Sequence, residues 1–238
     1  VPEHRMPKEA IIKQIADVKR GIEVYTNAVI GSTVFVEELA REFDAVIVAT
    51  GANKPAFPGI PGESYHGVFS ANDILLGVDH GAPCMTAVVG STESALDTSI
   101  ILAKSGNQVT LVTQKDSPEI SPNKKLVDMA VRAGVQFMVL TEPVAIKGDD
   151  KYSVKGIELR QLMLGDEDFD GKRLVLPLED SEFVMECNKV VLGTGHDPNP
   201  SIGMYSTLRT IGKNKIWTNP HSQTTIENVF AAGEMGIG

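Results

Sequence analysis

The stretch M-T-A-V-V-G-S-T-E-S-A-L-D, residues 85–97, indicates the fold of this chain. Residues 85–89 form an apolar run typical of a buried strand, Gly90 follows as a tight turn, and a helix is expected from there to residue 104. A second apolar run, residues 108–113, predicts the next strand. Strand, glycine turn, helix and strand open a Rossmann unit, in which a dinucleotide pyrophosphate lies on the helix N-terminus.

The turn carries a dinucleotide motif that is only partly complete. Of the usual G-x-G-x-x-G/A spacing, Gly90 and Ala95 occupy the first and third positions, but Thr92 stands where the second glycine lets the backbone approach the phosphates. Two hypotheses stay open: an occupied nucleotide site, or a strand–turn–helix without a ligand. In the first, the candidate binding residues at this turn are Gly90, Ser91, Thr92, Glu93 and Ser94.

Composition and charge narrow the class of protein. The chain has 238 residues, 42% of them hydrophobic and 22% charged, which is typical of a globular protein. A net charge of -9 argues against a nucleic-acid partner, and no apolar run reaches the roughly 18 residues that predict a membrane span. Cys84 and Cys187 form no C-x-x-C motif, so we predict a reducing, cytoplasmic location and no metal site.

Elements predicted elsewhere fit an α/β protein. The apolar runs at residues 44–51 and 188–195 both end in Thr-Gly, and such continuous runs are typical of parallel strands that are buried on both faces. Residues 229–234, V-F-A-A-G-E, predict a last buried strand. Alternating residues over 152–184 predict an antiparallel β meander with an exposed acidic turn at 165–171.

Helices are expected where apolar residues recur at helical spacing. Residues 7–19 and 70–77 show this spacing, as does the segment after Ser121, which we predict to be its N-cap. Thr33 is the predicted N-cap of a further helix, and residues 21–25 read as a strand.

Six motifs in order resemble the glutamate synthase small-subunit family, which belongs to the flavoproteins with two dinucleotide-binding domains. Residues 88–97 stand where that family has V-I-G-G-G-N-T-A-M-D, and residues 229–234 stand where it has V-F-A-A-G-D. The motifs are R-M-P-K (5–8), D-A-V-I-V-A-T-G-A (44–52), I-P-G-E (60–63), V-V-G-S-T-E-S-A-L-D (88–97), G-T-G-H-D-P-N (193–199) and V-F-A-A-G-E (229–234).

The resemblance implies a Rossmann-like NAD(P)-binding domain inserted in an incomplete FAD-binding domain. The expected parts are residues 1–79 for FAD, 80–204 for NAD(P), and 205–238 for the return to the FAD domain. The family's first FAD strand and glycine motif are expected before Val1, so we expect this chain alone to retain no FAD and to be inactive. Cofactor-binding residues implied by the resemblance are Thr50, Gly51, Gly195, Gly233 and Glu234.

The implied enzyme is a FAD-dependent NAD(P)H oxidoreductase that exports electrons to an accepting domain or subunit, with an iron–sulfur protein as one candidate. The family's Tyr-Arg-Arg after the second strand is Thr-Gln-Lys at residues 113–115. Lys115 keeps one cation without the bidentate fork of arginine, which predicts weak binding with a modest preference for NADPH over NADH. Asp116 stays open as a ribose carboxylate, and no catalytic residue is assigned. The alternative is a degenerate Rossmann-like domain that has lost nucleotide binding and serves assembly.

Overall fold

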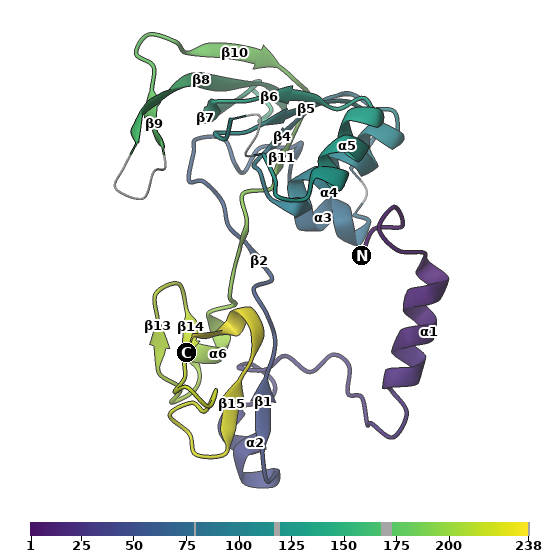
Figure 1. Ribbon diagram of the computed structural model, residues 1–238, viewed down its shortest axis with the longest axis vertical. Helices are drawn as coiled ribbons and strands as arrows, with labels where there is room; N and C mark the ends of the chain where they lie inside the picture. Colours follow the sequence, from purple (N-terminus) through teal and green to yellow (C-terminus); the bar gives the residue numbers. More distant parts are fainter. Residues whose placement is uncertain (79, 117–119, 168–172, 238) are drawn as a thin grey trace. The chain divides into compact units, whose positions relative to one another are not determined.

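The computed structural model describes residues 1–78, 80–116, 120–167 and 173–237. Its chain divides into two compact units (Figure 1). The first unit comprises Glu3–Lys54 and His196–Gly238 with Val1, and the second comprises Pro55–Gly195 with Pro2. Part of the predicted acidic turn, residues 168–171, lies outside the described residues.

The second unit is built on a five-stranded parallel sheet. Its strands follow the order β3 (Val68–Ser70), β11 (Lys189–Leu192), β4 (Met85–Val89), β5 (Gln108–Val112) and β6 (Gln136–Met138). The strand β3 lies within residues 55–79, which the sequence had grouped with the FAD part. Because β3 pairs with β11, this segment belongs with the central sheet, and the two compact units divide at residues 54/55 and 195/196. The assignment of residues 1–79 and 205–238 to FAD and of residues 80–204 to NAD(P) stays a prediction.

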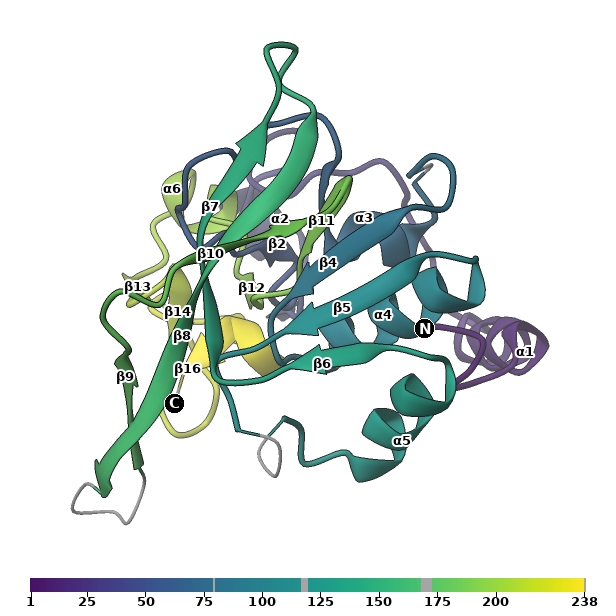
Figure 2. The same cartoon turned by 90° about the horizontal axis from the view of Figure 1, so that it is seen from above.

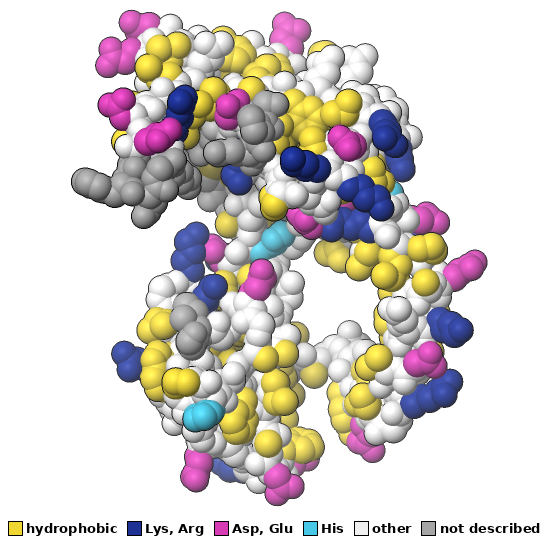
Figure 3. Space-filling view, in the orientation of Figure 1, with side chains coloured by type: hydrophobic (Ala, Val, Ile, Leu, Met, Phe, Trp, Pro, Cys, Tyr) yellow, Lys and Arg dark blue, Asp and Glu magenta, His cyan; other side chains and the backbone are white. Residues whose placement is uncertain are grey.

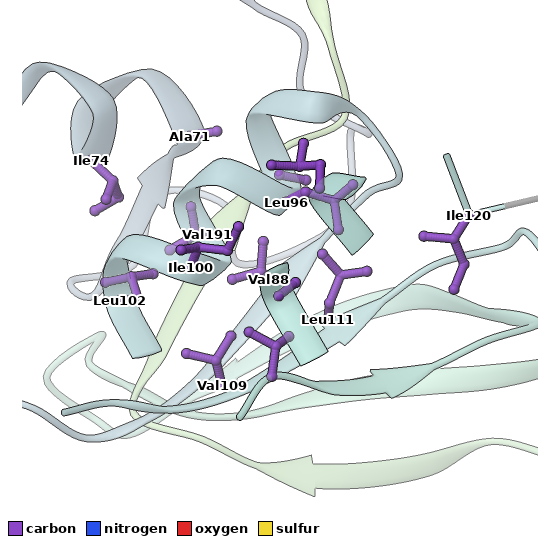
Figure 4. Packing of buried hydrophobic residues seen from close by; sticks show 14 residues of the cluster. Ala71, Ile74, Val88, Leu96, Ile100, Leu102, Val109, Leu111, Ile120 and Val191 are labelled. Carbon is purple, nitrogen blue, oxygen red and sulfur yellow. The ribbon is translucent and has the colours of Figure 1, made fainter. Parts of the chain in front are cut away.

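Three helices cover one face of this sheet (Figure 2): α3 (Ala71–Leu76), α4 (Glu93–Lys104) and α5 (Lys124–Arg132). Leu96 and Ile100 of α4 pack on Val88 of β4 and Leu111 of β5, and all four side chains are fully buried (Figure 4). The predicted strand–turn–helix–strand unit is thus present, and its core holds the turn at Gly90 in place.

The other face is covered by the antiparallel meander. Its strands are β7 (Thr141–Gly148), β8 (Val154–Glu167), β9 (Arg173–Pro177) and β10 (Phe183–Glu186). Ala87 and Val89 of β4 contribute to a second buried cluster with Ile157 and Leu159 of β8. Since Val88 packs on the helices and its neighbours pack on the meander, β4 is buried on both faces, as the continuous apolar run predicts.

Two of the predicted helix caps differ from the observed ones. The hydroxyl of Thr33 bonds the backbone of Val29 instead, and α2 begins at Val36. Asn123, not Ser121, caps α5, because its side-chain oxygen accepts the N–H of Leu126. The strand predicted at residues 21–25 is wrong: its apolar side chains are exposed, and no strand of the described chain pairs with it.

The first unit holds a parallel pair, β1 (Val46–Val48) and β15 (Val229–Ala231), beside α2 (Val36–Glu42) and α6 (Ser201–Met204). A three-stranded sheet comprises β13 (Thr210–Ile211), β14 (Lys215–Trp217) and β16 (Gly236–Ile237). Short strands β2 (Lys54–Pro55) and β12 (His196–Asp197) pair where the chain passes from one unit to the other. Helix α1 (Lys8–Val18) has no buried residue and shows hydrophobic side chains at its surface (Figure 3).

Among the described residues, no helix is both long and apolar enough to cross a membrane.

Candidate functional site

A cavity of about 440 Å³ opens at the carboxyl ends of strands β4, β5 and β11. This edge of a parallel sheet is where open α/β folds bind ligands, and the volume is within the usual range for small-molecule sites. The lining residues come from the turn after β4, the end of β5, the start of β7 and two nearby loops. They are Pro58, Ile60, Val89, Gly90, Ser91, Thr92, Val112, Thr113, Gln114, Lys115, Thr141, Glu142, Pro143 and Thr194.

Gly90 is required by both backbone conformation and space. Its φ of +132° is rarely adopted by residues with a side chain, and a Cβ atom there would collide with the carbonyl of Gly193. A Cβ on Gly193 would in turn lie 2.6 Å from the Cβ of Ala95. The first and third motif positions therefore stay small so that the ends of β4 and β11 and the start of α4 can pack together.

Thr92, at the second motif position, has a structural role that the sequence did not reveal. Its hydroxyl accepts the N–H of Ala95 at 3.1 Å, which makes it the N-cap of α4, and donates to the carbonyl of Gly193 at 2.8 Å. The cap fixes the start of this twelve-residue helix directly after Ser91 and Thr92, which line the cavity. Backbone N–H groups and the helix dipole at such a terminus favour an anion.

Replacing Thr92 with valine is expected to lower the free energy of unfolding by about 1–2 kcal/mol, because the N-cap bond and the bond to Gly193 are both lost. Thr92→Ser keeps the hydroxyl and is the matched control, with an expected loss below about 0.5 kcal/mol. Urea denaturation of the two variants measures the difference. Equal stability of the valine and serine variants would show that the hydroxyl contributes nothing.

Glu93 and Ser94, two further candidates, lie beside the cavity and do not line it within the described part of the chain. The carboxylate of Glu93 accepts a hydrogen bond of 3.0 Å from the side-chain amide of Asn123, the N-cap of α5. This bond directs the negative charge of Glu93 to the N-terminus of α5. Lys115 and its neighbour Gln114, in the loop that follows β5, do line the cavity.

Glu142 lines the cavity and is bonded to Arg160, and neither residue was predicted from the sequence. They face each other across the antiparallel pair β7–β8, and Arg160 Nε donates to Glu142 Oε1 at 3.0 Å. Gln114 Nε2 donates to the other oxygen of Glu142 at 3.1 Å. The hydrogen bond to Glu142 raises the pKa of Arg160 above its usual value, against the opposing effect of burial. Residues 18 positions apart carry no sequence signal of this contact, because the strand register is unknown beforehand.

The first unit brings together four of the residues implied by the resemblance. Strands β1 and β15 are parallel and in register, with Val48 opposite Ala231, so the Thr50-Gly51 and Gly233-Glu234 turns leave the same edge. Both glycines have positive φ, and a Cβ on either would meet open space. Their role in FAD binding stays a prediction, as does that of Gly195, whose carbonyl accepts the N–H of Ala56.

Comparison with known proteins gives a family model and sequence relatives that match this chain. A family model described as pyridine nucleotide-disulphide oxidoreductase matches residues 3–236. The chain is 27% identical over 269 residues to the NADPH-Fe(3+) oxidoreductase subunit beta of Geobacter sulfurreducens, and 28% identical over 263 residues to the glutamate synthase [NADPH] small chain of Halomonas elongata. All of this chain is covered in both comparisons, but it spans only 40% and 54% of those relatives.

Among solved structures, Mycobacterium tuberculosis FprA in complex with NADPH aligns with a TM-score of 0.74 at 18% identity, covering 99% of this chain and 68% of that one. The thioredoxin reductase of T. acidophilum aligns with a TM-score of 0.62 at 19% identity, over 82% of this chain and 58% of that one. These alignments confirm the predicted α/β fold.

The family model and the sequence relatives confirm the resemblance to glutamate synthase small-subunit proteins, and with it the cofactor classes FAD and NADP or NAD. The chain belongs to the pyridine nucleotide-disulphide oxidoreductase family.

Proposed function

We propose that the cavity at the end of β4 binds the ADP-ribosyl part of NAD(P)H in a flavoprotein oxidoreductase. The observation that carries this proposal is the position of the cavity, which adjoins the N-terminus of α4 and the tight turn at Gly90. Family membership supports the reaction type, the transfer of a hydride from a pyridine nucleotide to a flavin.

Each residue at the turn has a defined role in this proposal. Gly90 keeps the turn tight against Gly193, and Thr92 caps α4, so that the amides of Ser91 and Thr92 border the space for the pyrophosphate. Val89 and Val112 form part of the apolar wall, which limits water around the bound nucleotide.

The FAD part of the proposal rests on the first unit. The Thr50-Gly51 and Gly233-Glu234 turns leave one edge of the β1–β15 pair, and two glycines without steric contacts give room for a ligand to approach the backbone. Bound FAD would supply the two-electron chemistry, while the carboxylate of Glu234 would accept hydrogen bonds from its hydroxyl groups. The first relatives are named as subunits, which supports an electron-accepting partner, and we keep an iron–sulfur protein as one candidate.

Titration with ADP-ribose tests nucleotide binding without redox chemistry. Binding is expected in the wild type and should weaken at least about tenfold in Ser91→Glu, because the added carboxylate lies where the phosphates are expected. Ser105→Glu, at the other end of α4, is the matched control and should bind like the wild type. Unchanged affinity in Ser91→Glu would place the site elsewhere, and absence of binding in the wild type would favour the degenerate, assembly-only domain.

A further inference from the structure

We propose that Glu142 accepts a hydrogen bond from the 2′-hydroxyl of the adenosine ribose and gives this site a preference for NADH over NADPH. The inference rests on the proposed nucleotide site. Glu142 lines the same cavity as Gly90 and Ser91, and its side chain is only 19% exposed. It stands at the start of β7, next to the end of β5, which is the strand that commonly supplies the ribose-binding acid.

The carboxylate of Glu142 is held in one orientation from two sides. Gln114, which also lines the cavity, donates to one oxygen at 3.1 Å, while the guanidinium of Arg160 donates to the other through both Nε and Nη2. Oε1 already accepts two hydrogen bonds from Arg160, whereas Oε2, which accepts the bond from Gln114, has a second lone pair for a ligand hydroxyl. A fixed acceptor loses little side-chain entropy when a ligand binds.

Charge around the carboxylate disfavours a 2′-phosphate. Arg160 lies between two acids, since Nη1 is 3.8 Å from Glu182 Oε1 while Nε and Nη2 bond Glu142, so the edge of the guanidinium formed by Nε and Nη2 is already occupied. A phosphate group at the 2′ position would meet the negative charge of Glu142 instead of an open guanidinium. Lys115 is exposed and offers only a single, screened charge.

These contacts favour NADH, whereas the sequence predicts a modest preference for NADPH. That expectation of NADPH rested on Lys115 alone, with Asp116 as the one candidate acid. Asp116 does not line the cavity in the described structure, whereas Glu142 does. NADH and NADPH differ only at the 2′ position of the adenosine ribose, so a residue that contacts this position changes the ratio of their dissociation constants.

The test measures dissociation constants of NADH and NADPH for the wild type, Glu142→Ala and Glu142→Gln. We expect the wild type to bind NADH at least about tenfold more tightly than it binds NADPH. Glu142→Ala should shift the ratio by about 100-fold toward NADPH, because the hydroxyl acceptor is lost and the guanidinium of Arg160 is released for the phosphate. Glu142→Gln, which keeps the side-chain size and an oxygen for Arg160, should shift the ratio in the same direction by about tenfold.

Glu182→Gln is the matched control, because Glu182 also approaches Arg160 but does not line the cavity in the described structure. Its ratio should stay within about threefold of the wild-type ratio. A merely structural role of Glu142 would weaken both nucleotides equally, so an unchanged ratio in both Glu142 variants overturns the proposal, as does a wild type that prefers NADPH. If the wild type binds neither nucleotide, the proposed function fails and this assignment fails with it.

Discussion

Replacing Gly90 with valine is expected to abolish nucleotide binding and to lower the free energy of unfolding by more than about 3 kcal/mol. Two effects add in this variant. The φ of +132° is unfavourable for a β-branched residue, and the new Cβ would collide with the backbone carbonyl of Gly193. Because the backbone at Gly193 is held by a 2.7 Å hydrogen bond to Val89, it cannot move away without opening the sheet edge.

Gly134→Val is the control for this experiment. Gly134 also has a positive φ, +87°, but a Cβ there would meet open space, so only the conformational cost of about 1–2 kcal/mol is expected. Chemical denaturation gives the two stabilities, and titration with NADH gives the affinities. A folded Gly90→Val variant with wild-type affinity would contradict the assignment of the site to this turn.

Replacing Leu96 with alanine is expected to lower the free energy of unfolding by about 2–5 kcal/mol, the second largest effect on stability. Leu96 is fully buried in α4 and packs among Ile100, Val88 and Leu111, so its removal leaves a cavity between the helix and the sheet. Leu76→Ala, in the last turn of α3, is the matched control, because its side chain is 83% exposed. The control should lose less than about 0.5 kcal/mol. Similar losses in the two variants would contradict the packing of α4 on the sheet.

Features of the fold with local causes could be predicted from the sequence. The run at residues 85–89, the turn at Gly90 and the helix after it were predictable because apolar spacing and glycine act over a few residues. Likewise, Ser70 and Gly77 mark the two ends of α3, the first through its side-chain cap and the second through its left-handed backbone.

Features that depend on distant partners could not be predicted. Residues 21–25 alternate like a strand, but a strand also needs a partner, and the described structure supplies none. Glu142 and Arg160 meet because β7 and β8 pair in one particular register, which no local pattern encodes. The hydroxyl of Thr92 bonds the carbonyl of Gly193, which lies 101 positions away, so the dinucleotide motif alone could not predict this contact.

The central claim is that the pyridine nucleotide binds at the carboxyl end of β4, and mapping of amide chemical shifts in the isotopically labelled protein during titration with ADP-ribose tests it most directly. The account predicts that the largest changes occur at residues 90–92, at residues 113–115 and at Glu142, all of which line one cavity. Largest changes elsewhere, for example at residues 107–110 near the start of β5, would contradict the claim. The absence of any change at saturating ligand would also contradict it.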